Sequence, residues 1–300
     1  MSIAVIGSNG FLGRAVVAAL GAADMSVVEF PSARPFLRSD GLPANELASA
    51  SAVCYLASRI NPGIAERDPA AAAAHVTTLR NLTRALVDSG KRLIYPSSGG
   101  TVYDTDREPP YSETSPLKPI GRFGATKVEV EQLLAQAPGI ESVAMRISNA
   151  YGPGQRTGTG LGVIAHWLAA ASEGKPLRLF GAPETTRDFV YTDDVCDAFL
   201  RVITSDAPPA VVNIGSGIPT TLGEVAEIIA EIVDGAEIVH EPDRGFDVPR
   251  SWLDVGLARQ KLGWEPTTEL REGIRRTWEH NLRRLVRQEI SSGDRGGAAA

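Results

Sequence analysis

The chain has 300 residues, of which 43% are hydrophobic and 22% are charged, a balance typical of a folded globular protein. Its formal net charge of −6 at pH 7 argues against a nucleic-acid partner, because proteins that bind the phosphate backbone carry a basic face. No apolar run approaches the roughly eighteen residues that cross a membrane, and the N-terminal residues do not resemble a secretory leader, so we expect a cytoplasmic protein without a membrane partner.

Short β-branched runs alternate with longer helical patterns along the first half of the chain. A strand-like run at residues 2–6 precedes a helical pattern at residues 13–20, and the alternation continues to a strand-like run at residues 142–148. Such alternation predicts right-handed βαβ units, and therefore an α/β fold with a Rossmann-type doubly wound parallel sheet.

The alternation becomes less regular after residue 151, where glycine-rich and mixed segments follow. We therefore expect an NAD(P)-binding Rossmann domain over residues 1–160, whose sheet some later strands join, and a smaller α/β C-terminal lobe over residues 161–290 that mainly binds the substrate. Residues 291–300 are mostly small and polar, and we predict a disordered tail there.

A glycine-rich turn follows the first predicted strand and opens the first predicted helix. Its sequence, GSNGFLG, has G-x-x-G-x-x-G spacing. Glycines there permit positive φ and close approach of the backbone, so that the helix N-terminus can meet a pyrophosphate. We therefore predict a dinucleotide-binding loop whose cofactor contacts come from Gly7, Asn9, Gly10, Phe11, Leu12 and Gly13.

The second predicted strand bears on the identity of the dinucleotide. We expect this strand to end at Glu29, where a carboxylate can accept hydrogen bonds from the adenosine ribose hydroxyls, which favours NAD. Arg34 and Arg38 follow closely and could pair with a 2′-phosphate, so NADP is the alternative.

Nine short motifs, in order from about residue 2 to residue 285, resemble the extended short-chain dehydrogenase/reductases, and specifically their NAD-dependent nucleotide-sugar epimerase/dehydratase group, of the UDP-glucose 4-epimerase type. The motifs are GSNGFLG (7–13), YLAS (55–58), YPSSGGTVYD (95–104), FGATK (123–127), RISNAYGPGQ (146–155), RDFVYTDDV (187–195), NIGSG (213–217), RGFDVPRSWLD (244–254) and LGWEP (262–266). The resemblance implies NAD as the cofactor and a nucleotide-diphosphate sugar as the substrate. It also implies cofactor contacts from Leu56, Ala57 and Ser58.

In that family a Y-x-x-x-K pair performs the redox chemistry together with a nearby serine or threonine. The lysine binds the nicotinamide ribose and lowers the pKa of the tyrosine, which takes a sugar hydroxyl proton while hydride moves to NAD. By this resemblance Lys127 is the catalytic lysine, but Phe123 stands at the tyrosine position. The usual serine or threonine position falls on Gly99, and a neighbouring hydroxyl, from Ser98 or Thr101, could replace it.

Phe123 permits three interpretations. The chain could be a deliberate Tyr→Phe variant that binds its ligands without turnover, a natural paralogue that no longer catalyses, or an enzyme with a different proton donor. The rest of the motif, FGATKVEVEQLL, is that of a working site, which favours the first interpretation.

The second half of the chain supplies candidate substrate contacts. By resemblance, the amide of Asn149 contacts the substrate diphosphate, and Arg187 and Arg244 clamp the pyrophosphate of a nucleotide sugar, for which a guanidinium fork is well suited. Asp188 is expected to hold local structure. We expect no metal site, because the four histidines and two cysteines show no ligand spacing.

The motifs also limit the reactions that the protein could catalyse. The 4,6-dehydratase branch places an Asp-Glu pair where this chain has Gly100 and Thr101, so dehydration is disfavoured. Reversible NAD-dependent oxidation at C4 of a UDP- or dTDP-hexose, giving 4-epimerisation, is our first hypothesis, and a 4-ketoreductase of a deoxysugar pathway is the second. A catalytically silent nucleotide-sugar or dinucleotide sensor is the third. By family analogy we also expect a homodimer formed through helices at residues 70–89 and 124–136.

Overall fold

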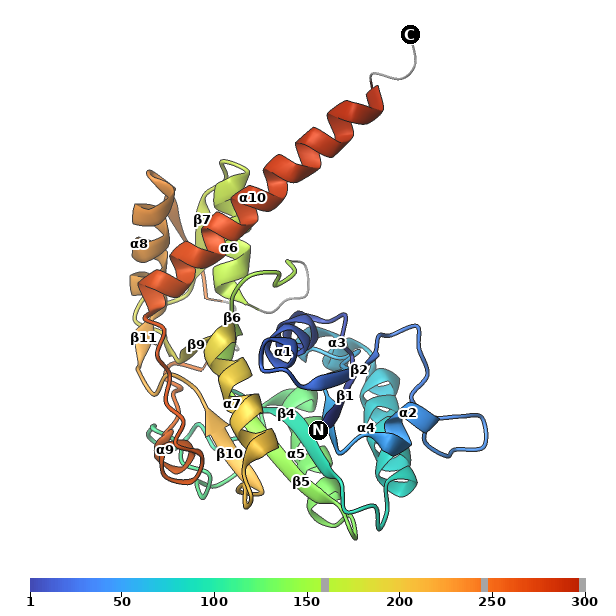
Figure 1. Ribbon diagram of the computed structural model, residues 1–300. Helices are drawn as coiled ribbons and strands as arrows, with labels where there is room; N and C mark the ends of the chain where they lie inside the picture. The colour runs from blue at the N-terminus through green and yellow to red at the C-terminus, as the bar shows by residue number, and fades with distance from the viewer. Residues whose placement is uncertain (158–161, 244–247, 297–300) are drawn as a thin grey trace.

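Six parallel strands form the central sheet of the larger part of the protein, in the order β10-β5-β4-β3-β1-β2 (Figure 1). The structure, a computed structural model, describes residues 1–157, 162–243 and 248–296. The strand order reverses beside β1, and the predicted α/β fold with a doubly wound parallel sheet is thereby confirmed. The strands are β1 (Ser2–Ile6), β2 (Ser26–Phe30), β3 (Ala52–Tyr55), β4 (Arg92–Ser98), β5 (Glu141–Ile147) and β10 (Val211–Ile214).

Side chains of β1 alternate between two separate cores. In β1, Ile3 and Val5 belong to one cluster of buried residues and Ala4 and Ile6 belong to another, and all four are at most 2% exposed. A parallel strand that is buried on both faces is apolar along its whole length, and this is why the strands could be recognised in the sequence.

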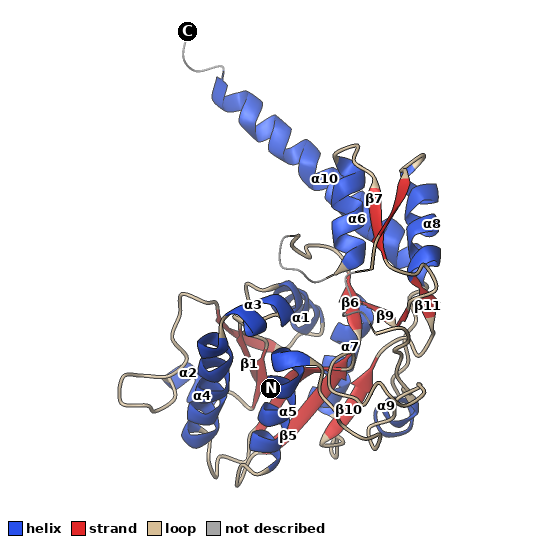
Figure 2. Ribbon diagram, turned by 180° about the vertical axis from the view of Figure 1, so that it is seen from behind, coloured by secondary structure: helices blue, strands red, loops and turns tan. Residues whose placement is uncertain are grey.

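Helices cover both faces of the sheet (Figures 1 and 2). The first face packs against α1 (Phe11–Ala22), α7 (Thr192–Thr204) and α9 (Gly256–Leu262). The second face packs against α2 (Asn45–Ser49), α4 (Pro69–Ala85) and α5 (Gly121–Ala135), and α3 (Pro62–Arg67) lies beside α4 and α5. Because α7, α9 and β10 come from the second half of the chain, that half completes the sheet layer.

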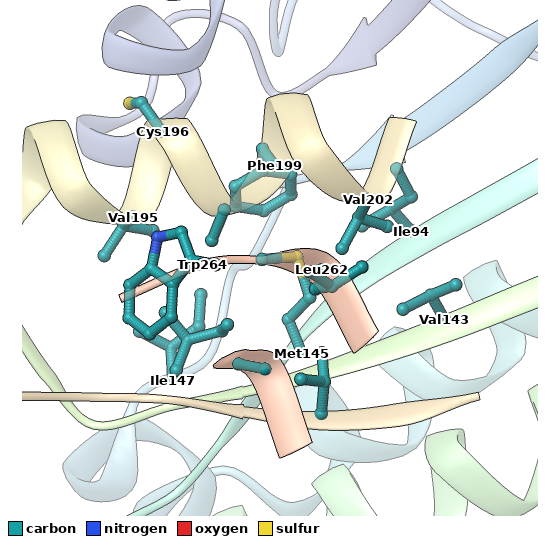
Figure 3. Packing of buried hydrophobic residues seen from close by; sticks show 14 of the residues in the cluster. Ile94, Val143, Met145, Ile147, Val195, Cys196, Phe199, Val202, Leu262 and Trp264 are labelled. Carbon is teal, nitrogen blue, oxygen red and sulfur yellow. The ribbon is translucent and has the colours of Figure 1, made fainter. Parts of the chain in front are cut away.

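Figure 3 shows how α7 packs on the sheet. Phe199 of α7 and Met145 of β5 are both fully buried in this core. The indole of Trp264, also 0% exposed, lies next to Val195 and donates its Nε1–H to the Asp194 carbonyl at 2.9 Å. This packing fixes α7 and the strand that precedes it, which belongs to the smaller lobe.

The smaller lobe combines two-stranded pairs with three helices. The pairs are β6 (Asn149–Tyr151) with β9 (Phe189–Tyr191), β7 (Leu177–Phe180) with β12 (Ile238–Glu241), and β8 (Thr186–Arg187) with β11 (Thr220–Thr221). The helices are α6 (Val163–Ser172), α8 (Leu222–Val233) and α10 (Leu270–Gly296). Leu168, Leu179, Ile229 and Ile274 form part of a core that is separate from the two cores of the large sheet.

Helix α10 packs in the smaller lobe at its N-terminal end, and its C-terminal part extends away from the rest of the protein (Figure 1). Glutamate–arginine pairs three and four residues apart, such as Glu272 with Arg276 at 2.7 Å, support its exposed surface. Its backbone stays helical to Gly296, so the part of the predicted disordered tail at residues 291–296 is helix in this structure. Residues 297–300 lie outside the described ranges. Among the residues described, no helix is both long and apolar enough to cross a bilayer.

Candidate active site at the carboxyl edge of the sheet

The glycine loop lies between β1 and α1 and depends on close backbone contacts. Gly7 has φ +88°, in the left-handed region, and its N–H donates to the Phe30 carbonyl at 2.8 Å. A Cβ at Gly13 would lie 2.0 Å from the Gly7 carbonyl oxygen, so no larger residue fits there. Gly10 caps the N-terminus of α1 with its backbone. The loop therefore leaves the start of α1 open to a ligand.

The segment after β3 packs against this loop. A Cβ at Gly7 would lie 2.5 Å from the Ala57 nitrogen, and the Leu56 N–H donates to the Ile6 carbonyl at 2.7 Å. Ser58 bonds instead to its own chain, with Oγ donating to the Ile60 carbonyl at 2.8 Å. Leu56 and Ala57 thus lie beside the glycine loop, as the proposed cofactor contacts require.

The loop also contains a buried hydroxyl, that of Ser8. Ser8 is 2% exposed, and its hydroxyl has no hydrogen-bond partner among the described residues. Leu12 packs against the large core, and Phe11, the first residue of α1, is half-buried. A glycine cradle with an unpaired buried hydroxyl fits the phosphates of a dinucleotide.

The end of β2 differs from the expectation. The strand ends at Phe30, and Glu29 lies inside it, level with Val5 and exposed. In the turn that follows the strand, Ser32 contacts the glycine loop: its N–H donates to Asn9 Oδ1 at 3.2 Å and its Oγ accepts from Asn9 Nδ2 at 3.1 Å. The sequence showed where the strand lay but not which residue of the following turn faces the loop.

Lys127 is almost completely buried at 6% exposure, in helix α5. Its Nζ donates to the Pro96 carbonyl at 2.8 Å and lies 4.6 Å from the ring centre of Tyr95 and 5.4 Å from that of Phe123. Burial lowers the pKa of Lys127 from 10.5 to about 8, an effect that the nearby carboxylate of Glu131 partly opposes. The lysine is therefore held in place by the end of β4.

Phe123 lies one turn before Lys127 and packs against Ile60, Ala65 and Ala72. It brings no hydroxyl to the site. Of the predicted substitutes, Thr101 has a buried Oγ1 without a hydrogen-bond partner among the described residues.

Ser98 ends β4 and pairs with Ile147 of β5, as its position in the motif requires. At the adjacent Gly99, a Cβ would lie 2.5 Å from Leu253 Cδ1. A serine or threonine at that position would therefore require the end of the Leu253 side chain to move.

A buried polar network lies behind the lysine, and sequence reasoning missed it. Arg146 Nη2 donates to Glu131 Oε2 at 2.6 Å, Ser97 donates to the same carboxylate, and Arg146 Nη1 donates to the Tyr103 hydroxyl at 3.1 Å. Tyr103 in turn donates to Asn213 Oδ1 at 2.6 Å. Charged residues within otherwise apolar strand and helix patterns were the signal that could have revealed the network.

The predicted substrate residues Asn149 and Arg187 line one cavity of about 130 Å³, together with Tyr151, Phe189 and Leu222. Arg187 Nη1 donates to the Val248 carbonyl at 2.6 Å. Val248 lies four residues after Arg244, the third predicted substrate contact. That contact, Arg244, lies outside the described residues.

Asp188 organises the walls of this cavity. Its carbonyl accepts both the backbone N–H of Asn149 at 3.0 Å and the side-chain amide at 2.9 Å. Its buried carboxylate accepts from Ser148, Ser216, Gly217 and Leu253, which belong to three different segments. The expected structural role of Asp188 is confirmed. Within the described residues, no group of three or more His, Cys, Asp or Glu side chains could hold a metal ion.

These features together define a Rossmann-type α/β protein with a dinucleotide cradle and a second, partly aromatic ligand cavity in the smaller lobe. The chain belongs to the NAD dependent epimerase/dehydratase family, whose sequence model matches residues 3–215. This is a family of NAD-dependent enzymes, and NAD is the cofactor that the glycine cradle fits.

Similar proteins include one named as an epimerase and one named as a dehydrogenase. The chain is 35% identical over 208 residues to a UDP-glucose 4-epimerase of Mycolicibacterium smegmatis, a match covering 68% of this chain and only 66% of that relative. It is 30% identical to the dTDP-6-deoxy-L-talose 4-dehydrogenase (NAD(P)(+)) of Kitasatospora kifunensis, covering 92% of this chain and 94% of that relative.

Among solved structures, the fold is similar to that of a UDP-glucose 4-epimerase from Thermotoga maritima with UDP-glucose. The TM-score is 0.84 and the sequence identity is 28%, with 95% of this chain and 100% of that chain covered. The likeness therefore extends over both lobes.

Proposed function

We propose that the chain has the active site of a nucleotide-sugar 4-epimerase, which acts by reversible oxidation at C4 of a UDP- or dTDP-hexose. In this chain Phe123 limits the turnover. The observation that carries this proposal is the buried Lys127, fixed at the carboxyl end of β4 next to the Phe123 ring. The cavity with Asn149 and Arg187 supports a substrate that carries a nucleoside diphosphate, which stays attached throughout the reaction. The similarity to UDP-glucose 4-epimerases favours epimerisation.

Bound NAD would accept a hydride from C4 and return it to either face of the sugar. The glycine loop would hold the dinucleotide phosphates with its backbone N–H groups and with the Ser8 hydroxyl. Lys127 would bind the nicotinamide ribose, and in Phe123→Tyr its positive charge would lower the pKa of the phenol that takes the C4 hydroxyl proton. Thr101 and Ser98 would offer hydroxyls for hydrogen bonds to the same oxygen.

The missing phenol hydroxyl sets the expected rate. A positioned acid/base typically contributes a factor of about 10² to 10⁴ in rate, so this chain is expected to be nearly silent. Phe123→Tyr should raise kcat/KM for interconversion of a 4-epimer pair by that factor, without added cofactor. Phe123→Leu, which also lacks a hydroxyl, is the matched control and should show no gain. If both ligands bind and Phe123→Tyr brings no gain, the proposal of an epimerase is wrong and the sensor hypothesis is favoured.

A 4-ketoreductase is the second candidate, and the match to the talose dehydrogenase favours it because that match covers nearly the whole chain. The two activities differ in their stoichiometry. A reductase consumes one NADH or NADPH for each 4-keto sugar, whereas an epimerase recycles its cofactor. Absorbance at the reduced-nicotinamide band, measured for Phe123→Tyr with a 4-keto sugar, distinguishes the two.

Two further properties are proposals. We expect a homodimer through α4 and α5, and a cytoplasmic location. Light scattering on the eluting protein tests the first, and an arginine placed in the exposed face of α4, as Ala74→Arg, should give a monomer if it is correct.

A further inference from the structure

One arginine side chain joins the glycine loop to a loop of the smaller lobe. Arg14, in helix α1, donates from Nη1 to the Asn9 carbonyl at 2.6 Å and from Nη2 to the Gly154 carbonyl at 2.9 Å. Asn9 belongs to the glycine loop, and Gly154 lies in the segment that follows β6. Two loops that are distant in the sequence are thereby held together across the boundary between the two lobes.

The chemistry of this contact indicates a role in positioning. Both acceptors are backbone carbonyl oxygens, and the guanidinium carries its N–H donors in a rigid planar fork. A single side chain can therefore bond both carbonyls at once and fix the distance between them. Because Arg14 is exposed, we expect its removal to alter the relative position of the two loops more than the stability of the fold.

The loop after β6 is fixed at its base, and Arg14 holds the part beyond that base. Tyr151 is 2% exposed, and a Cβ at Gly152 would lie 1.9 Å from Thr192 Oγ1, so the base packs tightly on α7. Further along, Gly154 has φ +80°, a conformation that glycine adopts without strain but that is one of many open to it. The hydrogen bond from Arg14 therefore selects one position of the loop.

The same loop reaches the wall of the substrate cavity. Gln155, next to Gly154, donates from Nε2 to the Ala150 carbonyl at 3.2 Å. Ala150 and Gly162 both line the cavity, and a Cβ at Gly162 would lie 2.5 Å from the same Nε2. A displacement of Gly154 would therefore move the amide group that packs behind the cavity wall.

We propose that Arg14 is a positioning residue that couples the two ligand sites. A dinucleotide that orders the glycine loop would also order the loop after β6, and would so favour binding of the nucleoside diphosphate. Coupling of this kind is reciprocal, so each ligand should raise the affinity for the other by the same factor. This role rests on the two ligand sites of the proposed function and is separate from the chemistry at C4.

The test is a double titration of the full-length protein by calorimetry. NADH is one ligand, and UDP or dTDP, whichever binds more tightly, is the other. In the parent, saturation with NADH should lower the dissociation constant of the nucleoside diphosphate at least fivefold, the lower end of typical coupling between sites. In Arg14→Met this factor should fall below twofold, while each ligand alone binds within threefold of the parent. Arg14→Lys keeps the charge without the fork and should behave as Arg14→Met does.

Arg201→Met is the matched control and should keep the coupling factor of the parent. Arg201 also bridges two segments by donating to backbone carbonyls, those of Leu262 and Gly263. It lies near the C-terminal end of α7, where Arg92 at the start of β4 donates to the Val202 carbonyl at 2.7 Å. This is the edge of the sheet opposite to the ligand sites.

Hydrogen exchange gives a second readout that needs only one ligand. NADH alone should slow amide exchange in the peptide covering residues 149–157 in the parent and in Arg201→Met. The same peptide in Arg14→Met should exchange at an unchanged rate, because the bridge that passes the ordering of the glycine loop to the smaller lobe is missing.

The outcomes separate this role of Arg14 from the proposed function. A coupling factor below twofold in the parent, or a factor that Arg14→Met or Arg14→Lys leaves unchanged, would overturn the role and leave both ligand sites intact. Equal weakening of both ligands by Arg14→Met, with the factor of the parent retained, would indicate a structural residue and would also overturn it. If neither nucleoside diphosphate binds, the proposed function is contradicted, and the exchange measurement with NADH still decides the role of Arg14. If NADH does not bind, both proposals are wrong.

Discussion

Burying the charged amine of Lys127 lowers the free energy of unfolding of the protein, and this loss can be measured. Burial lowers its pKa from 10.5 to about 8. One pKa unit corresponds to about 1.4 kcal/mol, so keeping the ammonium charged within the fold costs about 3 kcal/mol at neutral pH. Lys127→Met removes that cost but also the hydrogen bond to the Pro96 carbonyl, a loss of about 1 to 2 kcal/mol. The variant should therefore be more stable than the parent by about 1 to 2 kcal/mol at pH 7.

The sign of the pH dependence follows from linkage. Between pH 8 and 10.5 the unfolded chain binds more protons at this lysine than the folded chain does, so the parent gains stability as the pH rises. The Met variant lacks this group and gains nothing from it. From pH 7 to pH 10 the difference between the two proteins should change by about 2 to 3 kcal/mol, and the advantage of the variant should disappear.

Urea unfolding of the ligand-free proteins at pH 7 and pH 10, followed by circular dichroism, measures this double difference. All other titrating groups are common to the two proteins and cancel. Lys175→Met removes a positive charge from the surface, and its effect is subtracted to correct for the altered net charge. The method measures such differences to about 0.5 kcal/mol. If the difference in free energy of unfolding between Lys127→Met and the parent is the same at pH 7 and pH 10 within this precision, the reasoning is refuted.

Two further substitutions test the framework of the site. Gly13→Ala would place a Cβ 2.0 Å from the Gly7 carbonyl oxygen and should weaken NADH binding at least 100-fold in a calorimetric titration, whereas Gly21→Ala, with open space around its Cβ in the same helix, should bind normally. Arg146→Met leaves the Glu131 carboxylate buried without its partner and should lower the free energy of unfolding by about 3 to 5 kcal/mol, most of which the double variant with Glu131→Leu should recover. Equal losses in the single and double variants would contradict the ion-pair explanation.

The sequence predicted the parts of the fold that depend on local patterns. Buried strands such as β1 are continuous apolar runs, and the glycines of the loop stand where the backbone makes close contacts that a side chain would block. Both features were therefore predicted at the positions that they have in the structure. The position of Lys127 followed from a motif within a single helix.

What sequence reasoning missed depends on contacts between distant residues. Ser32 meets Asn9 because the turn after β2 folds back on the glycine loop, and no local pattern indicates the direction of that turn. The pairing of Glu131 with Arg146 joins a helix to a strand, so each residue alone looked like an exception to an apolar pattern. Such partners become visible only once the register of β4 and β5 is known.

The location of the site can also be argued from energetics alone, without any motif. A buried polar atom without a hydrogen-bond partner costs about 1 to 3 kcal/mol, so folded proteins retain few of them. Among the described residues, the side-chain atoms of this kind belong to Ser8, Thr101 and Gln155. Ser8 and Thr101 follow the carboxyl ends of β1 and β4 in the large sheet, where open α/β sheets bind ligands, and Gln155 follows β6 of the smaller lobe. The unpaired hydroxyls of Ser8 and Thr101 mark the same edge of the large sheet as the buried amine of Lys127, because a bound ligand would supply their missing hydrogen-bond partners.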